Sequence, residues 1–356
     1  MHINNNKRAF NQLLFEANLL LKKEGVLENK KRFFEFAPLL ILKLMSESVE
    51  MPYSRQSMRI KQKYNWKHFA KQEPQEMLQV LNRVFLPGLV KAYNRHTQFF
   101  QKKSSIKNPD TLKKLVDRLS ILNLLALNSD ILGDAFEYFL HQEGARYKQG
   151  LGIYFTPRHV IKLLLDLIPL KPNDKIYDPA CGSGGFLTEA FKILKKRSKT
   201  SSQYLNKKVI FGREISDSIK IAKMNLILLG ADPSTLSQID TLKTPVHNKF
   251  SVILANFPFS QKTDFGSLYG SQSKDANPLF LKHIMDALIM GGTAGVIVPD
   301  RLLFSESLEY IKVRKNLLET CNLLAVVQLH DFVFMPYTKQ PTSILIFKTV
   351  LTNIKK

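Results

Sequence analysis

One short segment places an amide, a proline and two aromatic rings directly after a run of apolar residues. Residues 251–259 read SVILANFPF, so an expected strand ends at Asn256 and continues into Phe257, Pro258 and Phe259. The side-chain oxygen of Asn256 and the main-chain carbonyl of Phe257 are two acceptors suited to the N–H bonds of an exocyclic amine. Holding both N–H bonds frees the nitrogen lone pair, and Phe259 offers a ring on which an extruded base can stack. These four residues therefore predict a catalytic segment that activates the amino group of a nucleobase.

A second segment has the composition of a ligand-binding turn. Residues 176–190 read IYDPACGSGGFLTEA, in which an expected strand ends at Asp178 and a helix begins near Phe186. Glycines let the backbone approach a ligand closely, as in the turns that hold pyrophosphate at a helix N-terminus. Asp178 instead favours a ligand with a cationic centre, such as a methyl donor with an ammonium and a sulfonium group, although a purely structural loop has the same pattern. The predicted cofactor-binding residues here are Asp178, Pro179, Ala180, Gly182, Ser183, Gly184 and Gly185.

Two further acids follow later expected elements. Glu214 ends the segment KVIFGRE, and an acid at the end of the second strand of such folds accepts hydrogen bonds from ribose hydroxyls. Asp240, in the segment QIDTLKTP, is placed to reach the edge of a nucleobase. Either residue alone is equally a solvated surface acid, but after the Asp178 turn both are predicted to bind the donor.

An aromatic turn precedes the first expected strand, in the segment GLGIYFTPRHV. Thr156 is expected to cap the helix that begins at Pro157 or Arg158. The turn either seals that helix as a hydrophobic staple or forms a wall against the methionine end of the donor. Its predicted cofactor-binding residues are Ile153, Tyr154, Phe155, Thr156, Pro157 and Arg158.

Short β-branched runs alternate with amphipathic helices in the part of the chain that carries these motifs. Six strands are expected, with the sequences KIYDPA, KVIFGRE, SVILANF, TAGVIVP, LLAVVQL and TSILIFK. Helices are expected between them over 159–168, 185–197, 217–229, 278–290 and 307–319. Alternating strands and helices predict an α/β fold with a mainly parallel sheet, which binds ligands at the carboxyl ends of its strands.

The first part of the chain reads as helix throughout. Apolar residues recur at helical spacing over 10–50, 74–100 and 110–142. We therefore expect two domains, an all-helical domain over 1–145 that contacts DNA or a partner, and a catalytic domain over 146–356.

Composition limits the environment and the partners. The 356 residues include 52 Lys and Arg against 30 Asp and Glu, and the net charge of +22 favours a polyanionic partner, although generally basic surfaces would give the same balance. Two cysteines provide no disulfide framework and no metal-ligand spacing, which fits a reducing compartment. No run is long and apolar enough for a membrane span, and the N-terminus lacks a signal-peptide pattern, so we expect a cytoplasmic protein without membrane or metal partners.

The order of the motifs resembles that of the N6-adenine DNA methyltransferases, and more closely the modification subunit of type I restriction-modification systems. The resemblance rests on GIYFTPR, DPACGSGGF, GREI, IDTL and LANFPF in sequence order. It extends to helical segments such as LLFEANLLLKK and ILGDAFEYFL, and to PLFLKHIMDAL, AGVIVPDRLLF and PTSILIFK.

The resemblance implies a class I, Rossmann-like methyltransferase domain of seven strands with the last one antiparallel, one more than the six expected here. It implies S-adenosyl-L-methionine as the donor and adenine in double-stranded DNA, flipped into a pocket at residues 256–259, as the acceptor. It further implies a DNA-specificity subunit, and with it a restriction subunit of the same system, as partners.

Two departures from the family pattern leave alternatives open. The family's catalytic tetrapeptide is usually Asn-Pro-Pro-Phe or Asn-Pro-Pro-Tyr, whereas Phe257 stands at its second position here. The sequence also ends at Lys356, before the family's C-terminal helical extension. The alternatives are a weakly active or non-catalytic remnant of such a subunit, and a methyltransferase that acts on RNA or on a protein glutamine.

Overall fold

The computed structural model describes residues 2–47, 66–127, 130–141, 156–197, 209–335 and 338–350. The chain divides into two compact units, one of residues 1–150 with 223–233 and one of residues 151–222 with 234–356. Residues 223–233 therefore belong to the same unit as the N-terminal helices. The single domain boundary near residue 145 that the sequence predicts does not include this segment in the first unit. None of the described helices is long and apolar enough to cross a membrane.

The described secondary structure of the N-terminal unit is all helix, as the sequence predicts. Its elements are α1 (His2–Lys23), α2 (Asn29–Glu47), α4 (Trp66–Phe69), α5 (Pro74–Val80), the π-helix η1 (Leu81–Phe85), α6 (Leu86–Thr97), α7 (Pro109–Ile121), the short η2 (Leu125–Leu127) and α8 (Ile131–His141). Aromatic rings fill its interior, where Phe33 contacts Phe136 and Phe99 at centroid distances of 4.9 Å and 6.1 Å. Such contacts hold α2 against α8, because burying large rings stabilises helix pairs.

Seven strands form one sheet in the described part of the second unit. They are β1 (Ile176–Asp178), β2 (Ile210–Glu214), β3 (Leu236–Gln238), β4 (Phe250–Asn256), β5 (Leu288–Pro299), β6 (Cys321–Gln328) and β7 (Thr342–Thr349). Their order is β3-β2-β1-β4-β5-β7-β6, and β7 runs antiparallel to both of its neighbours. The α/β class, the seven strands and the antiparallel last strand agree with the fold that the resemblance implies.

The six strands expected from the sequence are all present, but β3 was missed. It consists of three residues, Leu236, Ser237 and Gln238, of which only the leucine is buried. A strand this short shows no alternation of polar and apolar residues. Its pairing with β2 depends on the tertiary structure and cannot be predicted from the local sequence.

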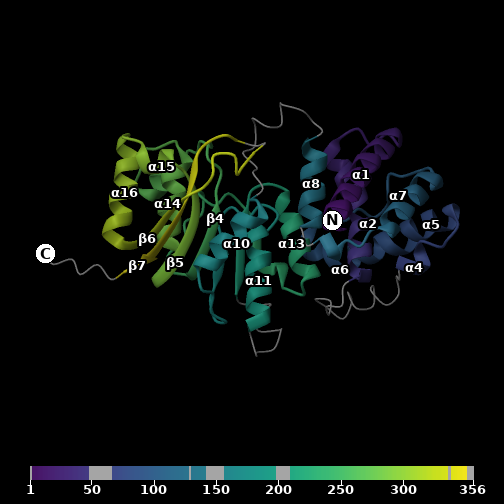
Figure 1. Cartoon of the computed structure of the whole chain (residues 1–356), viewed down its shortest axis with the longest axis horizontal. Coiled ribbons are helices and arrows are strands. Elements are labelled where there is room, and N and C mark those ends of the chain that lie inside the picture. Colours follow the sequence, from purple (N-terminus) through teal and green to yellow (C-terminus); the bar gives the residue numbers. More distant parts are fainter. Residues whose placement is uncertain are drawn as a thin grey trace. The chain divides into compact units, whose positions relative to one another are not determined.

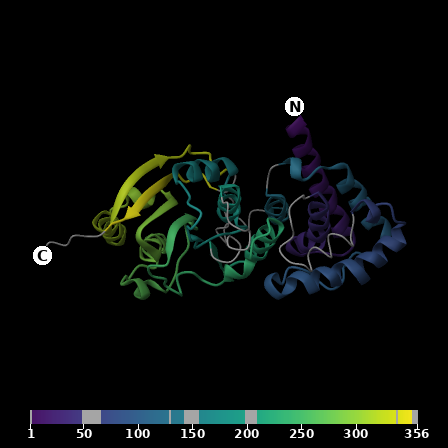
Figure 2. The ribbon, with the colours of Figure 1, turned by 90° about the horizontal axis from the view of Figure 1, so that it is seen from below.

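Helices cover both faces of the sheet. On one face lie α10 (Arg158–Leu167) and α11 (Gly185–Arg197), and on the other α14 (Ala276–Ala287) and α16 (Leu308–Thr320) (Figures 1 and 2). The main apolar core lies between the sheet and the second pair of helices. The remaining described elements are α15 (Arg301–Phe304) and the short helix η4 (Gly266–Tyr269) of this unit, and α13 (Ser218–Leu228) and the short helix η3 (Pro233–Thr235), whose residues are divided between the two units.

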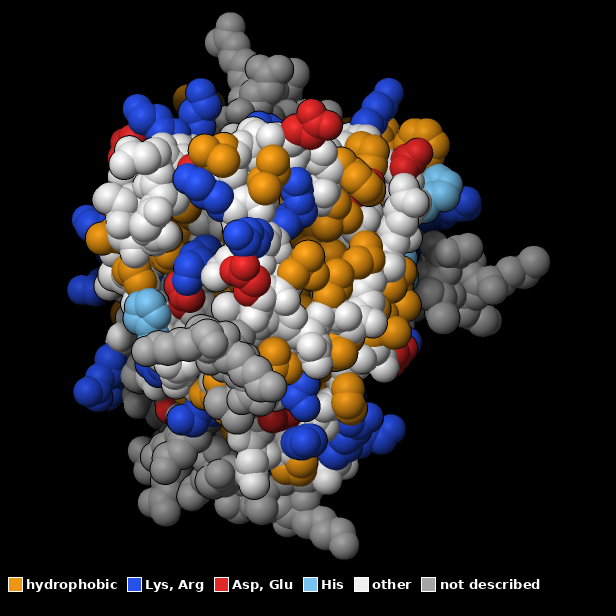
Figure 3. All heavy atoms as spheres, turned by 90° about the vertical axis from the view of Figure 1, so that its left-hand side faces the viewer, with side chains coloured by type: hydrophobic (Ala, Val, Ile, Leu, Met, Phe, Trp, Pro, Cys, Tyr) orange, Lys and Arg blue, Asp and Glu red, His pale blue; other side chains and the backbone are white. Residues whose placement is uncertain are grey.

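The edge of the sheet at β6 exposes apolar side chains. Leu324 and Val326 of this strand are half exposed, as is Ile311 of α16. The side of the molecule that carries α16 shows hydrophobic side chains gathered among Lys and Arg, with few acids (Figure 3). This surface is separate from the residues that line the pocket described below.

Candidate functional site

The strands that carry the two main motifs are neighbours in the sheet. β1 pairs in parallel with β4, so the loops that follow Asp178 and Asn256 leave the sheet at the same edge. The strand order reverses at β1, which is where open α/β sheets bind ligands.

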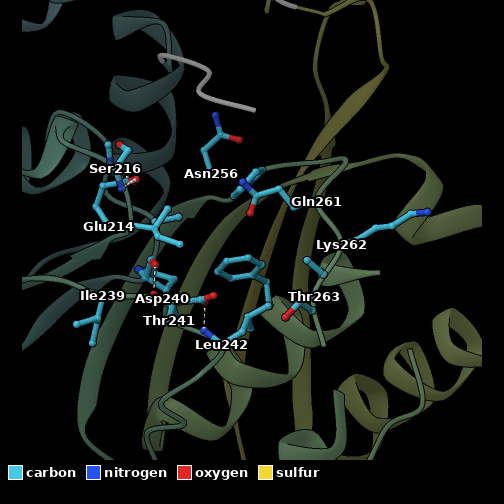
Figure 4. A pocket seen from close by; sticks show the side chains of 17 residues that line it. Glu214, Ser216, Ile239, Asp240, Thr241, Leu242, Asn256, Gln261, Lys262 and Thr263 are labelled. Carbon is cyan, nitrogen blue, oxygen red and sulfur yellow. Dashed lines mark hydrogen bonds between the residues drawn. The ribbon is translucent and has the colours of Figure 1, made fainter. Parts of the chain in front are cut away.

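A pocket with a free volume of about 810 Å³, its solvent-open part included, lies at this edge. Glu214 and Ser216 lie on one side of it and Gln261, Lys262 and Thr263 on the other, with Asn256 between them (Figure 4).

The turn after β1 is shaped by glycine. Gly184 has a φ of +84°, a backbone conformation that residues other than glycine rarely adopt. A Cβ at this position would also lie only 3.1 Å from the Cβ of Ala222. The amide of Gly182 donates to Oε2 of Glu214 at 3.1 Å. The glycine-rich turn is thereby tied to the end of β2.

The Glu214 carboxylate accepts hydrogen bonds from main-chain amides of two loops. While Oε2 accepts from Gly182, its Oε1 accepts from the amide of Ser216 at 2.8 Å. Asp240 makes the same type of contact in its own turn, where Oδ1 accepts from the amide of Leu242 at 3.0 Å (Figure 4). Both carboxylates line the pocket and give this side of it a negative character.

Asp178 differs from its predicted position. Its side chain is buried and does not line the pocket, although Pro179 and Ala180 do. Its Oδ1 accepts from the amide of Ala180 at 3.0 Å, so it holds the turn from inside. Burial raises the pKa of the Asp178 carboxyl well above its usual value, and the nearby Glu214 raises it further, while the Ala180 amide opposes both.

Asn256 lies at the end of β4 with its side-chain amide nitrogen bound and its oxygen free. Nδ2 donates to Oγ1 of Thr156 at 3.0 Å. Oδ1 is buried and, among the described residues, accepts no hydrogen bond. A buried acceptor without a donor is costly, so such atoms point to a functional role.

Thr156 was predicted to cap the following helix, and this prediction is wrong. Pro157, in an extended conformation, occupies the N-cap position, and α10 begins at Arg158 without a side-chain cap. The Thr156 hydroxyl is directed to Asn256 instead.

The two aromatic residues of the tetrapeptide are both buried. The ring of Phe257 lies in the core, parallel to the ring of Phe280, and does not line the pocket. Phe259 is only 2% exposed, and the ring of Phe334 lies 6.1 Å from it with the two planes nearly perpendicular. The buried Phe259 ring therefore does not present the open stacking face expected of it.

A buried amide supports the end of the tetrapeptide from outside. Asn277, at the start of α14, is fully buried, and its Nδ2 donates to the carbonyl oxygen of Phe259 at 2.7 Å and to Oδ1 of Asp275 at 3.0 Å. Asp275 in turn accepts from the Tyr310 hydroxyl at 2.6 Å. Burial and the Asp275 contact raise the pKa of Tyr310 to about 12, so its hydroxyl remains a donor at neutral pH.

A second buried network lies behind β1. The hydroxyls of Tyr177 and Tyr269 meet Nε2 and Nδ1 of His283 at 3.2 Å and 3.0 Å. Burial, with Arg213 nearby, lowers the pKa of His283 to about 3, so the ring is neutral. A neutral imidazole donates through one nitrogen and accepts through the other, which fits one bond to each tyrosine.

The structure brings together about a third of the predicted residues. Those that line the pocket are Pro179, Ala180, Gly182, Glu214, Asp240, Asn256 and Pro258. Ser183, Gly184 and Gly185 shape the turn without lining the pocket, and Arg158 pairs with Glu189 of α11 at 3.4 Å. Ile153, Tyr154 and Phe155 lie outside the described residues.

Several lining residues were not predicted from the sequence. They are Ile215, Ser216, Ile239, Thr241, Leu242, Gln261, Lys262, Thr263, Ala276 and Phe280. Most directly flank a predicted motif, so extending each motif by a few residues would have found them. Ala276 and Phe280 come from α14, whose sequence pattern is that of an ordinary buried helix.

The family model for N-6 DNA Methylase matches residues 127–354, well over half of the chain. The chain belongs to the N-6 DNA methylase family. The methylase subunit of the type I restriction enzyme EcoEI from Escherichia coli is 28% identical over 93% of this chain and 73% of its own length. Four such subunits from Escherichia and Salmonella align with 93% of this N-6 DNA methylase, which spans 64% to 73% of their lengths.

Solved structures share the fold. A chain from a study of complex assembly in the type I R-M system superposes with a TM-score of 0.66 at 22% identity, covering 94% of this chain and 73% of that one. The type I restriction-modification methyltransferase subunit from Streptococcus thermophilus gives a TM-score of 0.58 at 20% identity, covering 96% and 85%. The α/β sheet and the helical N-terminal region are thus the fold of these methyltransferases.

Proposed function

We propose that this chain transfers a methyl group from S-adenosyl-L-methionine to the N6 amino group of adenine in double-stranded DNA, as the modification subunit of a type I restriction-modification system. The observation that carries the proposal is Oδ1 of Asn256 at the carboxyl end of β4, a buried acceptor to which none of the described residues donates. It lies at a pocket whose opposite side carries Glu214 and Asp240. Family membership and the type I relatives support the same reaction.

The pocket fits the donor chemically. Glu214 and Asp240 are carboxylates that can accept hydrogen bonds from ribose hydroxyls and from a base edge. The glycine-rich turn lets the main chain of Ala180 and Gly182 approach a ligand. When bound, S-adenosyl-L-methionine supplies an electrophilic methyl group and carries positive charge, which suits this acidic side of the pocket.

Asn256 would act by holding the acceptor nitrogen. Its free Oδ1 and the carbonyl of Phe257 each accept one N–H bond of the adenine amine, and the lone pair is thereby released for attack. The Thr156 hydroxyl accepts from Nδ2, and in this arrangement Oδ1 is left for the base. No side chain has to remove a proton beforehand, so catalysis rests on positioning and on hydrogen-bond acceptors already in place.

DNA and a specificity subunit are the proposed partners, with a restriction subunit of the same system in the full assembly. The net charge of +22 supports a polyanionic substrate. The relatives that support the assembly are type I methylase subunits.

The test is methyl transfer from labelled S-adenosyl-L-methionine to DNA, with and without the cognate specificity subunit, followed by nucleoside analysis for N6-methyladenine. We expect Asn256→Ala to lower the transfer rate by at least about 10²- to 10³-fold, because it removes an acceptor that acts in the transition state. The Kd for the donor, measured by calorimetry, should change by no more than about threefold. This is well below the tenfold change that a loss of about 1.4 kcal/mol in binding free energy would cause.

Three results would contradict the proposal. Label in RNA or in a protein glutamine, with none in DNA, would assign a different acceptor. Donor binding without transfer in any arm would favour a non-catalytic remnant. Full activity of Asn256→Ala would remove this residue from the site.

A further inference from the structure

The ring of Phe257 points away from the pocket and touches it only through a second ring. Phe257 is fully buried, and its ring stacks on that of Phe280 with the centroids 5.1 Å apart and 4° between the planes. Parallel planes at this distance form the offset stack that aromatic pairs prefer. Phe280, in α14, is one of the residues that line the pocket.

Phe280 is the one aromatic side chain among the described residues that line the pocket. An aromatic ring is a stacking surface for any nucleobase. It shares the pocket with Glu214 and Asp240, the two acids on the side proposed for the donor. Phe259 belongs to the other side, where it is buried beside Phe334 and held through its carbonyl by Asn277.

We propose that Phe257 is a positioning residue for the nucleobase of the methyl donor, and that it acts by holding the plane of the Phe280 ring. The inference rests on the proposed function. A buried ring lying parallel to Phe280 blocks rotation of that ring, so the surface offered to the base is fixed before the ligand arrives. Without Phe257, the space behind Phe280 is a cavity into which its ring can turn.

The consequence is that the tetrapeptide serves both substrates. Asn256 faces the acceptor amine, whereas the next residue supports the donor base from within the core. Replacing Phe257 by proline restores the family's usual tetrapeptide but removes the ring behind Phe280. We therefore expect Phe257→Pro to weaken donor binding. If the only effect were the loss of steric bulk, the variant would instead match or exceed the transfer rate of the unmodified chain.

The experiment measures binding of S-adenosylhomocysteine by calorimetry, without DNA, to the full chain and to Phe257→Ala, Phe280→Ala and the double variant. Loss of an aromatic pair predicts a Kd raised about 5- to 10-fold in Phe257→Ala. The Kd of the double variant should lie within about twofold of the Kd of Phe280→Ala, because the effects of two coupled residues on binding are not additive. In steady-state assays the KM for the donor should rise by a larger factor than kcat falls, which a general loss of stability would not produce.

Phe257→Leu covers the case in which the alanine variant does not fold. Leucine retains much of the volume but not the flat face, so it should keep the fold and still raise the Kd for S-adenosylhomocysteine. Phe347→Leu is the matched control, since Phe347 is equally buried in the same core, on β7, and lines no part of the pocket. It should lower Tm without changing that Kd.

The outcomes separate the inference from the proposed function. If the unmodified chain binds S-adenosylhomocysteine and the Phe257 variants bind it equally well, the inference is wrong and the proposed function stands. Additive effects of Phe257→Ala and Phe280→Ala would also overturn it, because Phe257 would then act independently of Phe280. No binding by the unmodified chain would overturn the proposed function together with the inference.

Discussion

The loop after β1 and the loop after β4 leave adjacent strands at the same edge of the sheet, yet they are supported in different ways. In the first, carboxylates hold main-chain amides, as Asp178 holds that of Ala180 two residues on and Glu214 holds that of Gly182 across 32 residues. In the second, a neutral hydroxyl and a neutral side-chain amide hold the tetrapeptide. Thr156 binds Asn256 across 100 residues, and Asn277 binds the carbonyl of Phe259 across 18.

This difference suggests a division of labour between the two sides. Acids that hold their own turns are already in place for a ligand with hydroxyl and amine donors. The tetrapeptide instead presents a buried oxygen that accepts no hydrogen bond from the described residues and is available to an incoming N–H group. The donor side is therefore expected to govern affinity for the donor, and the acceptor side the rate of transfer.

The largest effect should come from the amide that supports the tetrapeptide. Asn277→Leu removes the hydrogen bond to the Phe259 carbonyl while retaining most of the volume. Since a misplacement of about 1 Å can cost about 100-fold in rate, we expect kcat to fall by about 100-fold with the donor Kd unchanged. Single-turnover transfer and calorimetry measure the two quantities.

Asn94→Leu is the control for the loss of stability. Asn94 also clamps a main-chain segment, through hydrogen bonds to the carbonyl and amide of Phe100 at 2.6 Å and 2.9 Å, but it lies in the N-terminal unit. It should lower Tm without the fall in kcat. Equal losses of kcat in the two variants would mean that Asn277 has only a structural role.

A smaller effect, with the opposite kinetic signature, should come from the donor side. Glu214→Ala removes a carboxylate that lines the pocket and holds Gly182 and Ser216. Loss of hydrogen bonds to a charged group predicts a donor Kd raised by about 10- to 100-fold, with kcat at saturating donor reduced far less. Calorimetry without DNA measures the first and saturation kinetics the second.

Glu189→Gln is the matched control for the charge. Glu189, on α11, is an acid of the same unit that pairs with Arg158 of α10 and with Lys192 of α11, and it does not line the pocket. Its loss should leave the donor Kd within about twofold, because exposed pairs contribute little. A fall in kcat without a change in Kd in Glu214→Ala would erase the proposed distinction between the two sides.

The contrast between the loops also explains what the sequence could predict. The turn after β1 is held by Asp178 within it and by Glu214 at the end of the following strand. The segments DPACGSGG and GRE therefore contain the residues that shape the turn. The supports of the tetrapeptide, Thr156 and Asn277, were not predicted, because they come from the segment before α10 and from α14, and the sequence does not say how these helices lie on the sheet. Thr156 was assigned a local role as a helix cap for the same reason.

Burial was a second limit on the prediction. The residue types of Phe257 and Phe259 mark the segment, but a sequence does not say to which face a ring turns after a strand ends. The ring of Phe257 lies in the core, and that of Phe259 is buried beside Phe334, a residue from the loop between β6 and β7. The class of fold was more accessible, because it follows from the alternation of strands and helices over many residues.

The smallest effect that still separates the two sides concerns the single hydrogen bond between Thr156 and Asn256. Thr156→Val retains the shape of the side chain and removes the acceptor for Nδ2, so the amide of Asn256 loses the contact that orients it. The loss of one neutral hydrogen bond predicts a fall in kcat of about 2- to 12-fold. Thr156→Ser should restore the rate, and Thr320→Val, which removes a hydroxyl bonded to the carbonyl of Asn316 in α16, should have no effect on it. If Thr156→Val instead raises the donor Kd and leaves kcat intact, Thr156 belongs to the donor side, and the orientation of Asn256 is set by the main chain of β4 alone.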